Sequence, residues 1–187
     1  MARTEKNSIN NENPFGPSYW FGEMKFCPKC GQDLARRNLD GEERERLVCE
    51  ACQFILYLNP KIVAGVLPIK SGNVFLLRRG IQPRLGAWTF PSGFMELNET
   101  AEEAAVRETK EETNLEVANL ALLNVYSRAT AGIVVVVYTA DVLGGVPALG
   151  RETLEIAEFS PSQIPWAELA FDTTKWALEE WHRRFSV

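Results

Sequence analysis

The sequence contains a single histidine among its 187 residues. That residue, His182, falls in a pattern typical of a C-terminal amphipathic helix, where we expect it at the surface. A mechanism that pairs histidine with a nucleophilic serine or cysteine is therefore effectively excluded. Carboxylates must carry any proton transfer that the protein performs.

Long apolar runs are also missing. The longest purely aliphatic run covers residues 133–137, whereas a helix needs about 20 apolar residues to cross a bilayer. The first thirteen residues lack the apolar core of a signal peptide. These absences predict a cytoplasmic protein without a membrane partner.

Basic residues are in deficit, because 20 Lys and Arg face 25 Asp and Glu, which gives a net charge of −5 and a pI near 5.1. This balance argues against general binding to nucleic acids. Hydrophobic residues make up 45% of the chain and charged residues 24%, a composition typical of a soluble globular protein. We expect no nucleic-acid partner.

The chain length has room for one ordinary domain and a small appendage. Polar residues and a Pro-Phe-Gly-Pro turn predict an extended or poorly ordered arm over residues 1–23. All four cysteines fall in residues 24–57, and strand and helix patterns alternate over residues 58–187. We therefore predict an arm, a small cysteine-containing domain and a larger α/β domain.

The four cysteines form two Cys-x-x-Cys pairs, Cys27/Cys30 and Cys49/Cys52, separated by eighteen residues. This spacing lies within the range of structural zinc sites. Four thiolates close the tetrahedron of one Zn²⁺ without an open position. Disulfides fit poorly with a chain that is not secreted, and a redox motif needs only one pair. We predict a zinc ribbon that the metal stabilises, because so small a domain cannot fold on apolar burial alone.

Nucleic-acid binding is the rival function of a zinc ribbon. The segment between and beside the cysteine pairs mixes charges and forms no basic stripe, with Glu42, Glu43, Arg44, Glu45, Arg46 and Glu50. We interpret the ribbon as a scaffold that could also form a homodimer contact.

Residues 93–115 are the segment around which the larger domain is organised. They predict a tight loop at Gly93 that enters a helix capped by Asn98 or Thr100. Asn114 stands just past the expected helix end, where asparagine is the second choice after glycine.

One stripe of this helix is first small and apolar and then acidic. At i, i+3 and i+4 spacing it contains Ala101, Ala104, Ala105, Glu108, Glu111 and Glu112. Acidic stripes are common on solvated surfaces, where a like-charge pair costs about 0.2–0.5 kcal/mol. In a partly buried cleft two such charges repel by roughly 3 kcal/mol, so the cluster needs hard cations such as Mg²⁺ or Mn²⁺.

The full spacing of the segment is Gly93, five residues, Glu99, seven residues, and then Arg107-Glu108-x-x-Glu111-Glu112. This spacing resembles the Nudix box, the loop–helix–loop signature of hydrolases that cleave nucleoside diphosphates linked to another moiety. Thr109 and Asn114 stand where the box usually has an aliphatic residue and a glycine.

The patterns around the box predict a mixed sheet between helices, which matches the Nudix α/β/α sandwich. Strands are expected at residues 61–69, 74–77, 88–90, 120–126, 133–142 and 153–159, and a closing helix at residues 171–185.

The resemblance implies roles for the box residues. Glu108, Glu111 and Glu112 would hold Mg²⁺ or Mn²⁺, and Arg107 would orient these carboxylates. Gly93 would let the loop backbone approach the metal. Water would then attack one phosphorus of the diphosphate.

The resemblance also implies one acidic ligand outside the box. We favour Glu152 in this role, with Glu155 as the alternative. The general base is one carboxylate among Glu112, Glu111 and Glu152. For the substrate, Trp88, Phe90 or Phe94 could stack on a base, although a core position suits each of them as well, and Arg128 is a candidate phosphate contact.

Two Nudix groups combine the box with a four-cysteine ribbon. The NADH pyrophosphatases have a proline-rich motif shortly after the box, and residues 113–132 here contain no proline. The group of FAD and ADP-ribose pyrophosphatases looks closer through residues 40–43, 59–61, 86–93 and 164–171. We expect FAD or ADP-ribose as substrate, with NADH as the alternative. A non-catalytic nucleotide sensor or interaction protein on the same fold is the alternative of another class, and the intact ligand set favours the enzyme.

Overall fold

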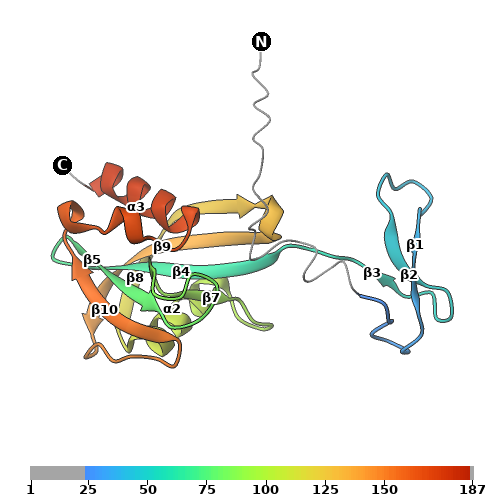
Figure 1. Cartoon of the computed structure of the whole chain (residues 1–187), viewed down its shortest axis with the longest axis horizontal. Coiled ribbons are helices and arrows are strands. Elements are labelled where there is room, and N and C mark those ends of the chain that lie inside the picture. Colours follow the sequence, from blue (N-terminus) through green and yellow to red (C-terminus); the bar gives the residue numbers. More distant parts are fainter. Residues whose placement is uncertain (1–23, 186–187) are drawn as a thin grey trace, which may run out of the picture. The chain divides into compact units, whose positions relative to one another are not determined.

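The computed structural model describes residues 24–185 (Figure 1). The arm predicted for residues 1–23 lies outside these residues. The chain divides into two compact units, one that ends at Asn59 and one that contains most of the residues from Pro60 onward, and each unit has its own sheet. Within residues 24–185, neither helix has the length and apolar character that crossing a bilayer requires.

The smaller unit is an antiparallel sheet in the order β1-β2-β3, made of β1 (Leu34–Arg37), β2 (Arg46–Cys49) and β3 (Ile55–Leu56). Its apolar core is slight, since Leu47 and Val48 are the buried hydrophobic residues beside two of the cysteines in the described part of this unit. So little apolar burial cannot offset the entropy of ordering some thirty residues, which agrees with a ribbon that depends on a metal.

The larger unit contains one mixed sheet in the order β10-β5-β4-β9-β8. Parallel pairing joins β4 to β9, and the other pairs are antiparallel. The strands are β4 (Lys61–Lys70), β5 (Asn73–Arg79), β6 (Trp88–Thr89), β7 (Ser92–Phe94), β8 (Glu116–Arg128), β9 (Ile133–Gly144) and β10 (Thr153–Phe159). The fold class predicted from the sequence is confirmed.

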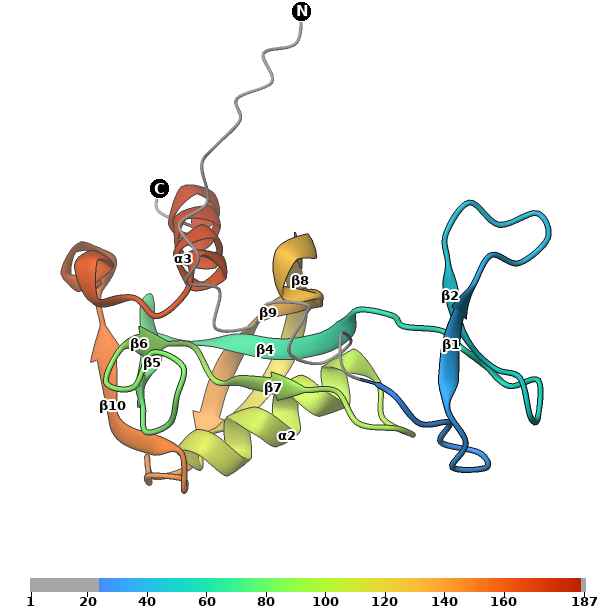
Figure 2. The same cartoon turned by 45° about the vertical axis from the view of Figure 1, so that its right-hand side comes forward.

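The hairpin of β4 and β5 is paired only at its closed end, through Ile69 with Val74 and Lys70 with Asn73. Beyond these residues the two strands separate, with β6 pairing to β5 and β7 pairing to β4 (Figure 2). The segment that leads into the box therefore passes from β5 to β4 between the two separated strands.

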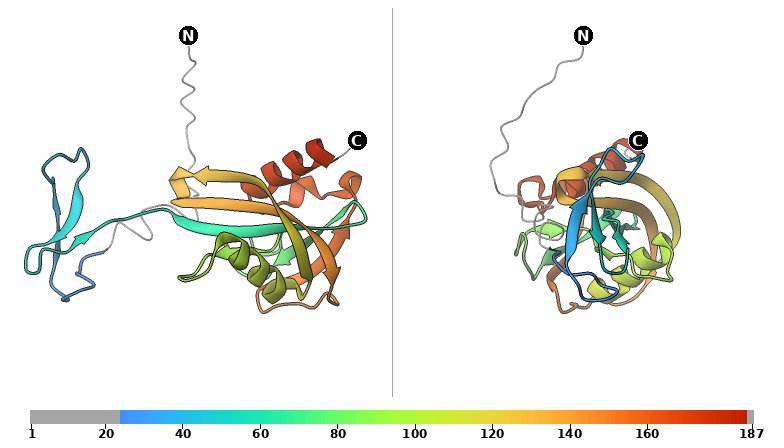
Figure 3. Two further views of the ribbon diagram at one scale, coloured as in Figure 1. Left: turned by 180° about the vertical axis from the view of Figure 1, so that it is seen from behind. Right: turned by 90° about the vertical axis from the view of Figure 1, so that its right-hand side faces the viewer.

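Two helices cover opposite faces of the sheet (Figures 1 and 3). On one face α2 (Ala101–Thr113) packs through Ala104 and Ala105, which are fully buried against Ala64 and Val66 of β4. The small side chains bring this helix close to the sheet, as the sequence predicts. On the other face α3 (Asp172–Phe185) packs on the larger core, with Leu67, Val74, Leu76, Trp88, Phe90, Leu123, Val135, Val137, Ile164, Ala177, Leu178 and Trp181.

The strand expected from residue 120 begins earlier, at Glu116. Val117 and Leu120 pack against the α2 side of the core, but the strand pairing shifts between Ala118 and Ala121, and Asn119 has φ 55°. This irregularity breaks the alternation of apolar and polar residues on which the prediction depends. The short β7 was not expected either, because its three residues follow Pro91 and read as loop.

Candidate active site and zinc site

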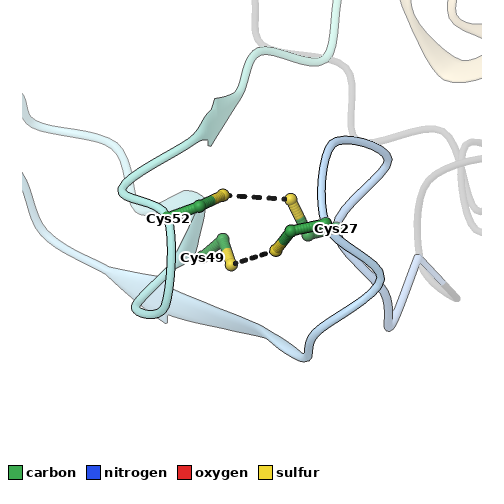
Figure 4. A group of neighbouring side chains, drawn as sticks. Cys27, Cys49 and Cys52 are labelled. Atoms are coloured by element: carbon green, nitrogen blue, oxygen red, sulfur yellow. Dashed lines mark hydrogen bonds between the residues drawn. The ribbon is translucent and has the colours of Figure 1, made fainter.

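The four cysteines of the smaller unit converge on one point. Their sulfur atoms all lie within 4.8 Å of one another, with Cys27 and Cys52 3.6 Å apart and Cys30 and Cys49 3.5 Å apart (Figure 4). Tetrahedral zinc with Zn–S bonds of about 2.3 Å has sulfur atoms about 3.8 Å apart. The arrangement therefore fits a Zn²⁺ ion with four thiolate ligands, and it leaves no position for a substrate.

Two tight turns create this convergence. A backbone hydrogen bond closes each pair, from Gly31 N–H to the Cys27 carbonyl at 2.9 Å and from Gln53 N–H to the Cys49 carbonyl at 2.8 Å. Gly31 has φ 76° and Gln53 has φ 59°, and this left-handed conformation lets the chain turn back on itself directly after each cysteine pair.

The thiols influence one another's protonation. Burial would raise the pKa of Cys49, but hydrogen bonds from the Cys52 backbone and from the neighbouring thiols outweigh it and lower this pKa to about 7. A backbone hydrogen bond from Gln32 would lower the pKa of Cys30, yet contacts with the other three cysteines raise it to about 12. Thiols this close compete for protons, and a cation that replaces the protons removes the competition.

The box helix has the caps that the sequence predicts. Of the two candidates, Thr100 is the N-cap, and it forms a capping box in which its hydroxyl accepts from Glu103 N–H and its own N–H donates to the Glu103 carboxylate. At the other end Asn114 takes the left-handed conformation with φ 59°. These caps fix the helix ends and hence the direction in which its carboxylates point.

Arg107 is the centre of an ion-pair network on α2. Its guanidinium donates to both carboxylate oxygens of Glu99, at 3.0 and 2.8 Å, and to Glu108 at 2.7 Å. Longer contacts reach Glu111 at 3.4 Å and the Phe94 carbonyl at 3.2 Å. The hydrogen bonds to Arg107 lower the pKa of Glu99 to about 2. Arg107 thus holds two predicted metal ligands and ties the helix to the preceding loop.

Glu108 fills the space above Gly93. A Cβ atom added to Gly93 would lie 2.2 Å from the Glu108 carboxyl carbon, so only glycine allows this approach. Burial raises the pKa of Glu108, and hydrogen bonding to Arg107 acts in the opposite direction. The group that approaches Gly93 is thus a carboxylate of the box, and the expected approach of the loop to a metal stays a prediction.

Glu112 is the most deeply placed acid of the box. Its carboxylate accepts a hydrogen bond from Ser92 N–H at 2.9 Å, next to Gly93. Burial raises its pKa to about 8, with the Ser92 hydrogen bond opposing and the charge of Glu108 adding to the shift. A carboxylate that has lost so much of its hydration favours a nearby cation, which is the property expected of a ligand for a divalent metal.

The segment that precedes β10 wraps the C-terminal end of α2. Gly150 N–H and the Thr153 hydroxyl both donate to the Glu112 carbonyl, at 3.2 and 3.0 Å. A Cβ on Gly150 would lie 2.5 Å from the Glu111 carbonyl oxygen. These contacts bring Glu152 beside the box, where its charge contributes to raising the pKa of Glu112.

The alternative acid, Glu155, has other partners. It pairs with Arg78 at 3.3 Å, and Arg78 also pairs with Glu168 at 3.0 Å. The geometry therefore favours Glu152 over Glu155 as the acid outside the box.

The predicted substrate contacts differ in how much of each side chain a ligand could reach. Trp88 and Phe90 are 5% and 2% exposed within the larger core, which leaves little ring surface for a base to stack on. Arg128 pairs with Asp172 at the start of α3 at 2.5 Å and lies over the Trp176 ring. Phe94 remains 45% exposed, beneath the ammonium group of Lys61. Among these aromatic residues, Phe94 has the open ring.

Sequence reasoning missed Arg79, the last residue of β5. Burial lowers the pKa of its guanidinium, and the negative charges of Glu112 and Glu152 act in the opposite direction. The sequence signal was two adjacent arginines at the end of an apolar strand, which is also the ordinary pattern of a strand that leaves the core.

Within residues 24–185, the four cysteines are the one group of three or more metal-binding side chains whose donor atoms already lie within 4.8 Å of one another. The box carboxylates share one region but bind protein partners, Arg107 for Glu108 and Glu111 and the Ser92 N–H for Glu112. In the larger unit the acidic groups are thus held by protein partners, whereas the smaller unit has a closed thiolate cluster.

Comparison with known proteins agrees with this description of two sites. A family model described as NUDIX domain matches residues 59–185, and one described as Nudix N-terminal, a zinc ribbon, matches residues 25–58. The chain therefore belongs to the Nudix family. With both regions present, it is a Nudix pyrophosphohydrolase of the zinc-ribbon type.

Named relatives and a solved structure are similar to the chain. An ADP-ribose pyrophosphatase of Methanocaldococcus jannaschii is 38% identical over 127 residues, 66% of this chain and 74% of the relative. The NAD-capped RNA hydrolase NudC of Vibrio atlanticus is 30% identical over 123 residues, 65% of this chain but 44% of the relative, so the match spans less than half of that protein. A crystal structure of a NUDIX hydrolase from Nitrosomonas europaea has a TM-score of 0.84 at 36% identity, over 87% of this chain and 93% of that chain.

Proposed function

We propose that the protein hydrolyses the diphosphate bond of ADP-ribose, yielding AMP and ribose 5-phosphate, and that FAD is a second substrate of the same type. One observation carries this proposal: the carboxylates of Glu108 and Glu112 lie against the loop at Ser92 and Gly93, and the charge of Glu152 acts on Glu112. The similarity to the Methanocaldococcus jannaschii ADP-ribose pyrophosphatase supports the choice of substrate.

In this proposal the box carboxylates bind Mg²⁺ or Mn²⁺, and the cysteines bind Zn²⁺. The fit of the residues to a divalent cation rests on an all-oxygen donor set, on desolvated carboxylates and on the room that Gly93 leaves for Glu108. When bound, the metal neutralises phosphate oxygens and lowers the pKa of the attacking water. Homodimerisation, the lack of a nucleic-acid partner and a cytoplasmic location stay predictions.

The protein's own residues position the reacting groups. Arg107 holds Glu108 and Glu111 in place through its guanidinium, and the Ser92 N–H holds Glu112. One carboxylate among Glu111, Glu112 and Glu152 accepts the proton of the attacking water. Burial at this site strengthens each of these electrostatic interactions relative to water.

NADH is the second candidate substrate, because relatives named NAD-capped RNA hydrolase NudC are 30% identical to the chain over 123 residues. Product analysis by chromatography separates the candidates. With Mg²⁺ or Mn²⁺ and equal concentrations of ADP-ribose, FAD, NADH and 8-oxo-dGTP, we expect the highest kcat/KM for ADP-ribose or FAD. A preference for NADH would contradict the substrate assignment.

The matched control is the double variant Glu111→Gln, Glu112→Gln, which should keep its zinc content and fold and lose turnover. If the unaltered protein binds nucleotide but cleaves none of the four compounds, the protein is a nucleotide sensor and the proposed function is wrong.

A further inference from the structure

Arg79 is held in one conformation where β5 ends. Its backbone pairs with both ends of the following loop, from Arg79 N–H to the Ala87 carbonyl at 2.9 Å and from Gly86 N–H to the Arg79 carbonyl at 2.8 Å. Its Nε donates to the Pro83 carbonyl at 2.8 Å, and the guanidinium lies 5.1 Å from the centre of the Phe171 ring. The side chain is therefore half-buried and preorganised.

Strand pairing and hydrogen bonds place the backbone of Arg79 beside the acidic site, and the charges of Glu112 and Glu152 act on its guanidinium. Thr153 lies opposite Arg79 in the pairing of β10 with β5, and its hydroxyl bonds to the Glu112 carbonyl at 3.0 Å. The neighbouring Gly80 donates its N–H to the Glu152 carbonyl at 2.6 Å. Hydrogen bonds and strand pairing thus connect Arg79 to the C-terminal end of the box helix and to Glu152.

The guanidinium of Arg79 has unused donors. Among the described residues it forms no ion pair, and its one side-chain hydrogen bond uses Nε, which leaves both terminal nitrogens without a protein acceptor. Arg78 differs in this respect, because it pairs with Glu155 and Glu168 and lies over the Trp88 ring. The Glu112 carboxylate, whose charge acts on Arg79, accepts a hydrogen bond from the Ser92 N–H instead.

A half-buried guanidinium with two parallel free donors matches a phosphate group, which accepts such donors bidentately. Beside carboxylates that would bind cations, the Arg79 guanidinium would add a positive charge that the protein itself supplies. We propose that Arg79 binds the diphosphate of the substrate through its terminal guanidinium nitrogens. This inference rests on the proposed hydrolysis and adds the residue that holds the phosphates opposite the metal-binding carboxylates.

The test compares Arg79→Met with Arg79→Lys and with the matched control Arg78→Met, the adjacent residue of the same type on the same strand. Three quantities are measured on the full chain: KM and kcat for ADP-ribose, the dissociation constant of AMP by calorimetry in Mg²⁺, and the dissociation constant of Mn²⁺ by electron paramagnetic resonance. AMP is a product, so its binding reports on phosphate recognition without turnover.

We expect Arg79→Met to raise KM for ADP-ribose and the AMP dissociation constant on the order of 10- to 100-fold, the loss expected for a hydrogen bond to a charged group. Arg79→Lys should recover part of this loss, because lysine keeps the positive charge but lacks the two parallel donors of the guanidinium. Mn²⁺ should bind Arg79→Met at least as tightly as the unaltered protein, since a neighbouring positive charge is gone. Arg78→Met should bind AMP normally.

Unchanged AMP affinity in Arg79→Met would overturn the inference. A parallel loss of Mn²⁺ affinity would also overturn it, because it would show that Arg79 supports the fold of the site. The same holds if Arg78→Met weakens AMP binding equally. If the unaltered protein cleaves no dinucleotide, the proposed function fails, while the AMP and Mn²⁺ titrations still decide the role of Arg79.

Discussion

The two metal-binding regions of this chain are organised in opposite ways. In the ribbon, four sulfur atoms lie within 4.8 Å of one another, and almost no apolar core supports them. In the larger unit, extensive apolar cores hold the elements in place, while the box carboxylates bind Arg107 and a backbone N–H. We therefore expect the fold of the ribbon to depend on its metal site, whereas apolar packing holds the elements that carry the proposed catalytic site.

This difference follows from the chemistry of the two ligand sets. A thiolate tetrahedron is closed and binds its metal permanently, whereas carboxylates with protein partners can exchange those partners for a cation and a substrate. Removing the metal should therefore have opposite consequences in the two regions.

The largest effect is expected from loss of zinc. Cys49→Ser should abolish zinc binding and unfold the ribbon, because structural zinc contributes about 10 kcal/mol or more to the folding of such domains. The larger unit should keep its melting temperature. Zinc analysis, limited proteolysis and calorimetry on the full chain test both statements. If the larger unit unfolds together with the ribbon, the two regions do not depend on their metals in different ways.

Glu112→Gln should have the opposite consequence, with a loss of activity and no loss of stability. We expect kcat to fall about a thousandfold, which corresponds to roughly 4 kcal/mol of transition-state stabilisation. Stability without added metal should not decrease, since a buried carboxylate whose pKa is about 8 is replaced by a neutral amide. Kinetics and thermal unfolding measure the two quantities, with the exposed Glu179→Gln as control. A less stable variant would contradict the account.

Gly93→Ala tests the fit between the loop and the box helix. The added methyl group would meet the Glu108 carboxylate, and a displacement of about 1 Å can cost about a hundredfold in rate. Gly144→Ala is the control, because its Cβ would meet only Glu116 at 3.3 Å. We expect a large loss of kcat for the first variant and none for the second; equal activities would show that the approach at Gly93 has no role in catalysis.

A smaller effect is expected from the pair of Glu99 with Arg107. Because the pKa of Glu99 is lowered to about 2, the pair stabilises the fold fully above the ordinary glutamate pKa, and this contribution is lost as the pH falls toward 2. The melting temperature of Glu99→Gln should therefore lie below that of the unaltered protein at pH 5, and the difference should shrink by pH 2.5. A constant difference would mean that the pair does not titrate as described.

The smallest effect is expected at the helix cap. Thr100→Ala removes the side-chain half of the capping box and should cost about 1 kcal/mol of stability, while Thr100→Ser should keep the cap. Denaturant unfolding compares the two variants. If they are equally stable, the cap does not contribute to the position of the box.

Local features of these regions were predictable from the sequence. The cysteine pairs predict the sulfur cluster because each knuckle depends on only a few neighbouring residues. The caps Thr100 and Asn114 are predictable for the same reason, since a cap forms within one helical turn. The box spacing identified the acidic helix face, while the catalytic roles of its residues stay predictions.

Long-range features were not predictable. Arg79 lies beside the Glu152 segment because β5 pairs with β10, and Gly150 contacts the box helix because a distant loop returns to it. Neither arrangement leaves a local pattern in the sequence. The burial of Trp88 and Phe90 likewise depends on how α3 covers the sheet, which their strand pattern alone does not reveal.

The most direct test of the central difference is dialysis of the full chain against a chelator strong enough to remove Mg²⁺ and Mn²⁺ but too weak for a four-thiolate zinc site. The account predicts one zinc ion per chain after dialysis, no hydrolysis of ADP-ribose, and full recovery of hydrolysis when Mg²⁺ or Mn²⁺ is added. Hydrolysis that persists without added metal, or that returns only with zinc, would contradict it.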